Sequence, residues 1–271
     1  MDGMGESRSY RKAAVESTSI LYHNMPTALL IIDVQNDFLP PTGSLAVSSG
    51  PDILPLLSDL LDSSKWEWNA VVTSQDYHPA GHISFASSHP PSKVLDEKTL
   101  VNGFGEECTQ ILWPDHCVQG SKGAEIEKGL RGDLEAWKEK MIVVRKGYHP
   151  TIDSYSAFEG YLTSPTDPSE PPASLLDAPR RKSAEASDLA KTLRAKGIDK
   201  VVIVGLAIDF CISATAVSAL EASFQTLLIA PATRAVRPEA VDGIWQKLEK
   251  LGGTIVGRDG EWEKQVREWV A

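Results

Sequence analysis

The chain has 271 residues, of which 42% are hydrophobic and 24% charged, values that are ordinary for a soluble globular protein. It is long enough to bury a core without disulfides or a structural metal. Its 27 lysines and arginines against 37 aspartates and glutamates give a net charge of −10. Such an acidic chain disfavours nucleic acid or an anionic membrane as the main partner, and no apolar run reaches the roughly 18 residues of a membrane span.

The cysteines and the first residues predict the compartment. Three cysteines, Cys108, Cys117 and Cys211, are too few and odd in number for a disulfide framework, which favours a reducing environment. Residues 1–24 are polar and mixed in charge, and they lack the apolar core of a secretory signal. We therefore expect a mobile N-terminal tail over 1–24 and a cytoplasmic protein.

Short, unbroken apolar runs predict strands that are buried on both faces, as in parallel sheets. Between and after these runs, apolar residues recur at helical spacing. The predicted strands cover residues 28–33, 70–74, 141–144, 200–205, 226–230 and 254–256. Four predicted helices cover residues 53–61, 189–196, 238–251 and 261–270, and a further helix is expected to begin near Cys211. Alternating strands and helices predict a three-layer α/β/α domain with a mostly parallel sheet of about six strands.

One segment interrupts this alternation. Residues 163–181 carry five prolines among serines, aspartates and a glutamate. We expect an exposed Pro-rich insert that packs as neither helix nor strand, because such a composition buries little apolar surface. With no internal repeat, residues 25–271 are expected to form one domain that contains this insert.

Chemically active side chains follow four of the predicted strands. Asp33, Asp76 with His78, Lys146 and Cys211 each lie at or just past the carboxyl end of a strand. In open parallel sheets ligands bind beyond these ends, so we expect these groups to share one crevice.

Cys211 is a candidate nucleophile. A thiol at the start of a helix feels the positive end of the helix dipole, which favours the thiolate, and the same backbone N–H groups can hold an oxyanion. Beside it, Asp33 could act as a general acid and base, and Lys146 could stabilise the thiolate. The alternatives are a buried structural cysteine, an Asp33 that caps a turn and a solvated Lys146.

A second group of residues has the chemistry of a metal site. Asp76 and His78 stand two apart at a strand end, and His116 offers another imidazole. Two histidines and one carboxylate leave open positions on an ion, as catalytic sites do. His82 is a further or outer ligand candidate, whereas Cys117 is interpreted as a small buried residue. The alternative is that these histidines merely decorate a polar loop.

Six sequence blocks, taken in chain order, resemble the nicotinamidases, which belong to the isochorismatase-like cysteine hydrolases. The resemblance runs from about residue 28 to residue 256. The blocks are DVQNDF (33–38), QDYHP (75–79), HISF (82–85), LWPDHCV (112–118), KG (146–147) with YSAF (155–158), and GLAIDFCISATA (205–216). The tail and the Pro-rich insert depart from the family pattern.

The resemblance implies a flavodoxin-like α/β/α fold and the hydrolysis of nicotinamide to nicotinate and ammonia in NAD salvage. It implies that Cys211 is the nucleophile, forms a thioester, and works with Asp33 and Lys146. It also implies a divalent metal, most often zinc (Zn2+), on residues Asp76, His78 and His116.

The same resemblance implies finer details of the site. A cis peptide before Ala207 would place the N–H groups of Ala207 and Cys211 as an oxyanion hole. Phe38, Trp113 and Phe210 would line the pocket for the substrate's ring.

Other readings of the same residues remain open. A related amidase of the superfamily, acting on a carbamoyl group or another small amide, would share Asp33, Lys146 and Cys211 but would not need the metal residues. A catalytically silent binding module would lack the nucleophile, and isochorismatase action is disfavoured because cleaving a vinyl ether needs no thiol. The sequence leaves open the identity of the metal, whether His82 contacts it, and assembly into a homo-oligomer.

Overall fold

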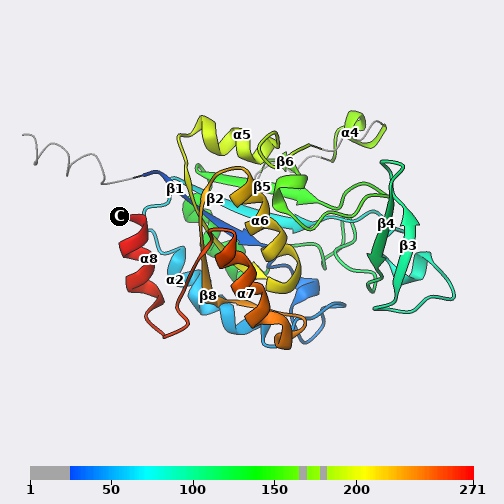
Figure 1. Cartoon of the computed structure of the whole chain (residues 1–271), viewed down its shortest axis with the longest axis horizontal. Helices are drawn as coiled ribbons and strands as arrows, with labels where there is room; N and C mark the ends of the chain where they lie inside the picture. Colours follow the sequence, from blue (N-terminus) through cyan, green and yellow to red (C-terminus); the bar gives the residue numbers. More distant parts are fainter. Residues whose placement is uncertain (1–24, 165–169, 178–181) are drawn as a thin grey trace, which may run out of the picture.

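A seven-stranded sheet forms the centre of the protein, whose computed structural model describes residues 25–164, 170–177 and 182–271 (Figure 1). The predicted tail, residues 1–24, lies outside the described residues. The spatial order of the strands is β6-β5-β2-β1-β7-β8-β9. In chain order the strands are β1 (Thr27–Ile32), β2 (Ala70–Asp76), β5 (Met141–Lys146), β6 (Tyr161–Thr163), β7 (Lys200–Leu206), β8 (Gln225–Arg234) and β9 (Thr254–Val256).

All six predicted strands are present, and they pair in parallel. β6 was not predicted, because three residues carry too little pattern; it adds to the edge antiparallel to β5. Counted along the chain, the parallel strands lie in the order 3-2-1-4-5-6. This confirms a doubly wound α/β/α sheet; its strand order differs from the 2-1-3-4-5 order of flavodoxin itself. The strand order reverses between β1 and β7.

Helices cover both faces of the sheet. Alternate strand residues point to opposite faces, so Leu29 and Ile31 pack into one core while Leu30 packs into the other. The first core is closed by α2 (Leu54–Leu60), α3 (Lys128–Leu134) and α8 (Trp262–Val270). The second is closed by α5 (Asp188–Ala195), α6 (Ser213–Glu221) and α7 (Val241–Lys250). Within the described ranges, no helix combines the length and apolar character that a membrane span needs.

Two small elements lie outside these layers. The hairpin of β3 (Glu97–Val101) and β4 (Glu107–Ile111) lies at the end of the molecule remote from α8 (Figure 1). The short helix α4 (Ala173–Asp177) lies within the Pro-rich insert, so the expectation that this segment forms no helix is wrong. Pro171 and Pro172 directly precede the helix, where a missing N–H is tolerated, and none of the residues of α4 is buried.

Candidate active site

The candidate site lies at the carboxyl ends of four neighbouring strands. Asp33 directly follows β1, Asp76 ends β2 and Lys146 ends β5, where it pairs in register with Asp76. Cys211 lies in a helical turn just after β7. Because β5, β2, β1 and β7 are adjacent and the strand order reverses between β1 and β7, these residues meet at the point where doubly wound sheets bind ligands.

A glycine allows β1 and β7 to approach closely at this point. Gly205 has φ +120°, and a Cβ there would lie 2.2 Å from the carbonyl oxygen of Ile32. Any side chain at Gly205 would push β7 away from β1 and separate Cys211 from Asp33.

The side chains of three buried residues lie close together; we call Asp33, Lys146 and Cys211 the thiol cluster. Lys146 Nζ lies 2.9 Å from Asp33 Oδ2 and donates to Cys211 Sγ at 3.2 Å and to the Ser154 carbonyl at 3.3 Å. Ser74 Oγ donates to Asp33 Oδ1 at 2.7 Å and orients that carboxylate. Asp33 Oδ2 pairs with Lys146 as an ion, and among the described residues it accepts no well-aligned hydrogen bond.

Burial and charge determine the protonation of this cluster. Burial raises the pKa of Asp33, and the neighbouring carboxylate of Asp76 adds to the rise while Lys146 opposes it. Burial alone would lower the pKa of Lys146, but the carboxylates of Asp33 and Asp76 raise it well above its ordinary value. Lys146 therefore stays a cation between two carboxylates and a thiol.

The thiol of Cys211 differs from the sequence-based expectation. Cys211 belongs to the π-helical turn Ile208–Ile212 that precedes α6, and it is only 6% exposed. Burial raises the pKa of its thiol well above the ordinary value; Lys146 opposes this, while Asp33 and Asp76 reinforce it. The helix-start position favours the thiolate, whereas the burial of this turn opposes it. The cis peptide between Leu206 and Ala207 is present, as the resemblance implied.

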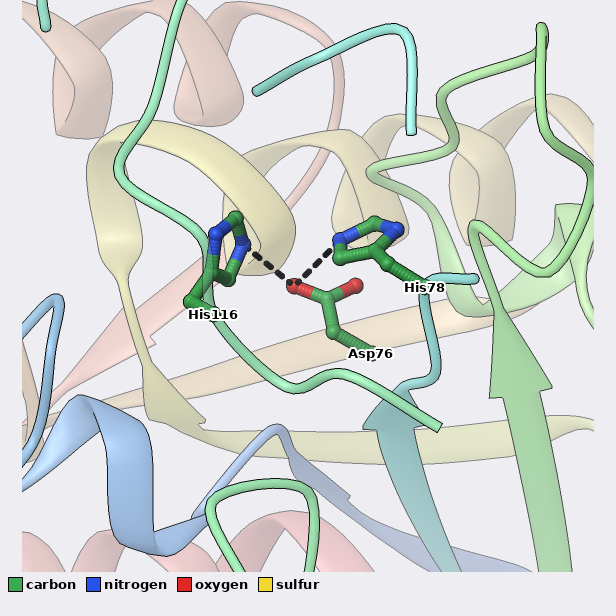
Figure 2. Close-up of side chains that lie close together, drawn as sticks. All are labelled: Asp76, His78 and His116. Atoms are coloured by element: carbon green, nitrogen blue, oxygen red, sulfur yellow. Dashed lines mark ion pairs between the residues drawn. The ribbon is translucent and has the colours of Figure 1, made fainter. Parts of the chain in front are cut away.

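Asp76, His78 and His116, here called the histidine cluster, converge beside the thiol cluster (Figure 2). The Nε2 atoms of His78 and His116 each lie 3.8 Å from Asp76 Oδ2, and all three residues are buried. The Nδ1 atoms are engaged elsewhere: that of His78 by the Gly147 carbonyl and that of His116 by the Pro114 carbonyl, both at 2.8 Å. Each imidazole therefore presents Nε2 towards the carboxylate.

The donor set of this cluster fits a divalent cation. Two imidazole nitrogens and a carboxylate oxygen are ligands that zinc takes, and here they lie within 4.8 Å of one another. Burial lowers the pKa of His78 to about 3, so its imidazole is neutral, the form that binds metals. Burial opposes the charged form of His116, but the neighbouring carboxylate of Asp76 raises its pKa. Burial alone would raise the pKa of Asp76, but Lys146 and both histidines hold it below its ordinary value.

His82, the further or outer ligand candidate, lies behind His78. The two rings stack with centroids 4.2 Å apart. His82 Nδ1 is bound to Ser84 Oγ at 2.7 Å, and its Nε2 lies 3.2 Å from the Ile152 carbonyl. Both ring nitrogens of His82 are therefore engaged away from Asp76. Cys117 is fully buried, as expected.

Aromatic rings stand next to the two clusters. Trp113 and Phe210 meet edge to face with centroids 4.9 Å apart, and Trp113 Nε1 donates to the Tyr155 hydroxyl at 3.1 Å. Phe38, the third residue expected in the ring pocket, packs against the ring of His116 with centroids 5.6 Å apart. Sequence analysis gave Tyr155 no role, although it lies inside one of the quoted blocks.

A buried carboxylate supports the aromatic wall from the other side. Asp209 accepts the backbone N–H groups of Val236 and Arg237 at 3.0 and 2.9 Å. The Arg237 guanidinium lies 4.9 Å from the centre of the Phe210 ring. This contact could not be predicted from the sequence, because Arg237 comes from the loop after β8.

Comparison with known proteins places this site in a family. The sequence matches the isochorismatase domain over residues 27–164 and 168–259. It is 36% identical to the nicotinamidase of Acinetobacter baylyi over 226 residues, which are 83% of this chain and 89% of that protein. The structure resembles that of the yeast nicotinamidase with a TM-score of 0.72 at 27% identity, covering 86% of this chain and all of that one.

A further solved structure is also similar to this chain. The pyrazinamidase of Pyrococcus horikoshii, solved in complex with zinc, matches with a TM-score of 0.60 at 28% identity, covering 85% of this chain and 98% of that one. The chain therefore belongs to the isochorismatase family, and within it to the nicotinamidase group of hydrolases.

Proposed function

We propose that the chain hydrolyses nicotinamide to nicotinate and ammonia through a thioester on Cys211. The observation that carries the proposal is the contact between the two clusters. Lys146 binds Asp33 and Cys211 on one side and Asp76 of the histidine cluster on the other. A nucleophile, a proton carrier and a set of metal ligands therefore share one buried rim, and the similarity to nicotinamidases covers most of the chain.

The reaction begins with proton transfer from Cys211 to Asp33. The sulfur attacks the amide carbon, and the N–H groups of Ala207 and Cys211 hold the resulting oxyanion. When the carbon–nitrogen bond breaks, Asp33 returns the proton to the departing ammonia. A water molecule then gives one proton to Asp33 and attacks the thioester carbon. The carbon–sulfur bond breaks, Asp33 returns that proton to the sulfur, and the acid leaves as nicotinate after giving its remaining proton to solvent.

Lys146 keeps these groups in place during both steps. Its ammonium lies between the Asp33 carboxylate and the Cys211 sulfur, so it stabilises the thiolate that proton transfer creates. It stays charged throughout, because a neutral amine would leave two buried carboxylates unpaired.

Asp76, His78 and His116 would hold a divalent metal, and we propose zinc. When bound, the metal supplies a Lewis-acidic position for the nitrogen of the pyridine ring. Trp113, Phe210 and Phe38 would enclose the ring, and the protein's part is to orient the amide carbon over Cys211.

The setting of this reaction follows from its chemistry. The product, nicotinate, is a precursor in NAD salvage, to which we assign the enzyme. The described cysteines are all free, and catalysis through Cys211 needs a reduced thiol, which suits the cytoplasm.

An ammonia-release assay tests the proposal. The purified enzyme is expected to release ammonia from nicotinamide, to lose this activity in a strong chelator and to regain it with added zinc. Ammonia release from other small amides, but not from nicotinamide, would contradict the proposal and favour a related amidase. Full activity after verified metal removal would contradict the metal's part alone.

A further inference from the structure

The loop that follows β1, residues 34–38, reaches both sides of the histidine cluster. Gln35 in this loop is fully buried. Its Oε1 accepts the backbone N–H of Asp76 at 2.8 Å, and its Nε2 donates to the Asp76 carbonyl at 2.8 Å and to the Ala124 carbonyl at 2.9 Å. One side-chain amide thus binds both backbone groups of Asp76, which it holds at the end of β2.

Asp37, two residues further on, binds the other side. Its Oδ2 accepts the backbone N–H of Cys117 at 2.7 Å, directly after His116. The carbonyl of Cys117 in turn accepts the backbone N–H of His78 at 3.1 Å. The Asp37 carboxylate fits against Gly123, where a Cβ would lie 2.0 Å from its Oδ2. Asp37 therefore holds the turn that connects His116 to His78.

Through these hydrogen bonds the 34–38 loop sets the backbone positions of Asp76, His78 and His116. A metal site needs its donors within about 0.5 Å of the right positions, and short side chains such as Asp and His pass a backbone shift directly to the donor atoms. We propose that Gln35 and Asp37 are positioning residues for the metal, and that they fix the separation of Asp76, His78 and His116 before the cation binds. The inference rests on the proposed function in one respect, the cation in the histidine cluster.

Neither residue belongs to a group of possible metal ligands among the described residues. Both N–H bonds of the Gln35 amide are used, and its oxygen already accepts a hydrogen bond. The residue between them, Asn36, provides a matched control. Its Nδ2 donates to the Lys122 carbonyl at 2.7 Å, so it makes a hydrogen bond of the same kind from the same loop to a segment without ligands.

The test is the affinity of the metal-free protein for Zn2+, measured by competition with a chromophoric chelator. Gln35→Met keeps the length of the side chain but none of its hydrogen bonds, and Asp37→Ala removes the acceptor for Cys117. Each is expected to weaken zinc binding by about 10–100-fold, the usual effect of losing a partner behind a metal ligand. Asn36→Ala should bind zinc like the wild type. Asp37→Asn retains an acceptor oxygen and should restore most of the affinity.

Melting temperatures measured without metal distinguish a positioning role of Gln35 and Asp37 from a role in the stability of the fold. If Q35M and D37A melt at lower temperature without metal but bind zinc as tightly as the wild type, the inference is wrong. If Q35M does not fold, the comparison of D37A with D37N still tests the inference. D37N can accept the hydrogen bond from the Cys117 N–H and D37A cannot, so D37N should bind zinc more tightly. A wild type that binds no divalent metal would also overturn it. A wild type that binds zinc without hydrolysing nicotinamide would contradict only the proposed function.

Discussion

The thiol cluster and the histidine cluster lie on the same rim but are held in different ways. In the thiol cluster the members bind one another, since Lys146 contacts both Asp33 and Cys211. In the histidine cluster each member is held from outside, by the carbonyls of Gly147 and Pro114 and by the amide of Gln35.

The distances within the histidine cluster agree with this difference. The 3.8 Å between its facing atoms is too long for a hydrogen bond. It is near the roughly 3.3 Å that separates two ligands at zinc bond lengths of about 2 Å in a tetrahedron. The thiol cluster thus contains its own cation, Lys146, whereas the spacing of the histidine cluster suits a metal cation bound between its members.

The largest expected effect comes from removing the nucleophile of the thiol cluster. Cys211→Ala should lower kcat by about 10⁶-fold, as loss of the nucleophile does in other covalent hydrolases. Cys108→Ala is the control, because Cys108 lies on the β3–β4 hairpin and should have no effect. Steady-state ammonia release measures both. A C211A enzyme that keeps a substantial part of the wild-type rate would place the nucleophile elsewhere.

The next largest effect is expected from substitution of the other two residues of the thiol cluster. Asp33→Asn and Lys146→Ala should each lower kcat by about 10²–10⁴-fold. Since the cluster acts as a unit, the double variant should lose little more than the worse single variant. The measurement is kcat for the three variants, after circular dichroism has shown that each is folded. Losses that multiply would show that Asp33 and Lys146 act independently.

A smaller effect is expected from a substitution at Gly147, whose carbonyl holds His78 of the histidine cluster. Gly147 has φ +61°, and a Cβ there would lie 2.3 Å from the His78 ring, whereas Gly197 has φ +71° and open space around it. Gly147→Ala and Gly197→Ala should share a backbone penalty of about 1–2 kcal/mol in urea unfolding. Only G147A should also weaken zinc binding, by about 10–100-fold. Equal zinc affinities in the two variants would contradict the role of Gly147.

Much of the architecture could be predicted because buried parallel strands have a strong sequence pattern. Runs such as that before Asp33 are apolar without interruption, and the polar residues Asp33, Asp76 and Lys146 mark the rim at the ends of β1, β2 and β5. The short strand β6, the hairpin of β3 and β4, and helix α3 were missed because they lack such runs or a clear helical period. The order of the strands in the sheet could not be predicted, because apolar runs define strands but carry no information about their neighbours.

The site could be predicted only in part. Strand ends bring Asp33, Asp76 and Lys146 together wherever the strands are neighbours, so their placement follows from the fold class. The pKa of the Cys211 thiol does not follow, because it depends on how deeply the turn after β7 is buried and on nearby carboxylates. The contacts of Gln35 and Tyr155 are also invisible in the sequence, because their partners are more than 40 residues away.

In the proposed reaction the two clusters act together on a carboxamide attached to a pyridine ring. The most direct test compares kcat/KM for nicotinamide and benzamide on the zinc-loaded wild type and on His116→Ala. Benzamide has nearly the same shape and the same amide but no ring nitrogen. A site built around a polar ring atom can reject the analogue by up to about 10⁴–10⁵-fold, whereas an apolar slot discriminates by about 10²-fold at most. We predict a strong preference for nicotinamide in the wild type that shrinks in H116A; comparable values for both amides in the wild type would contradict the account.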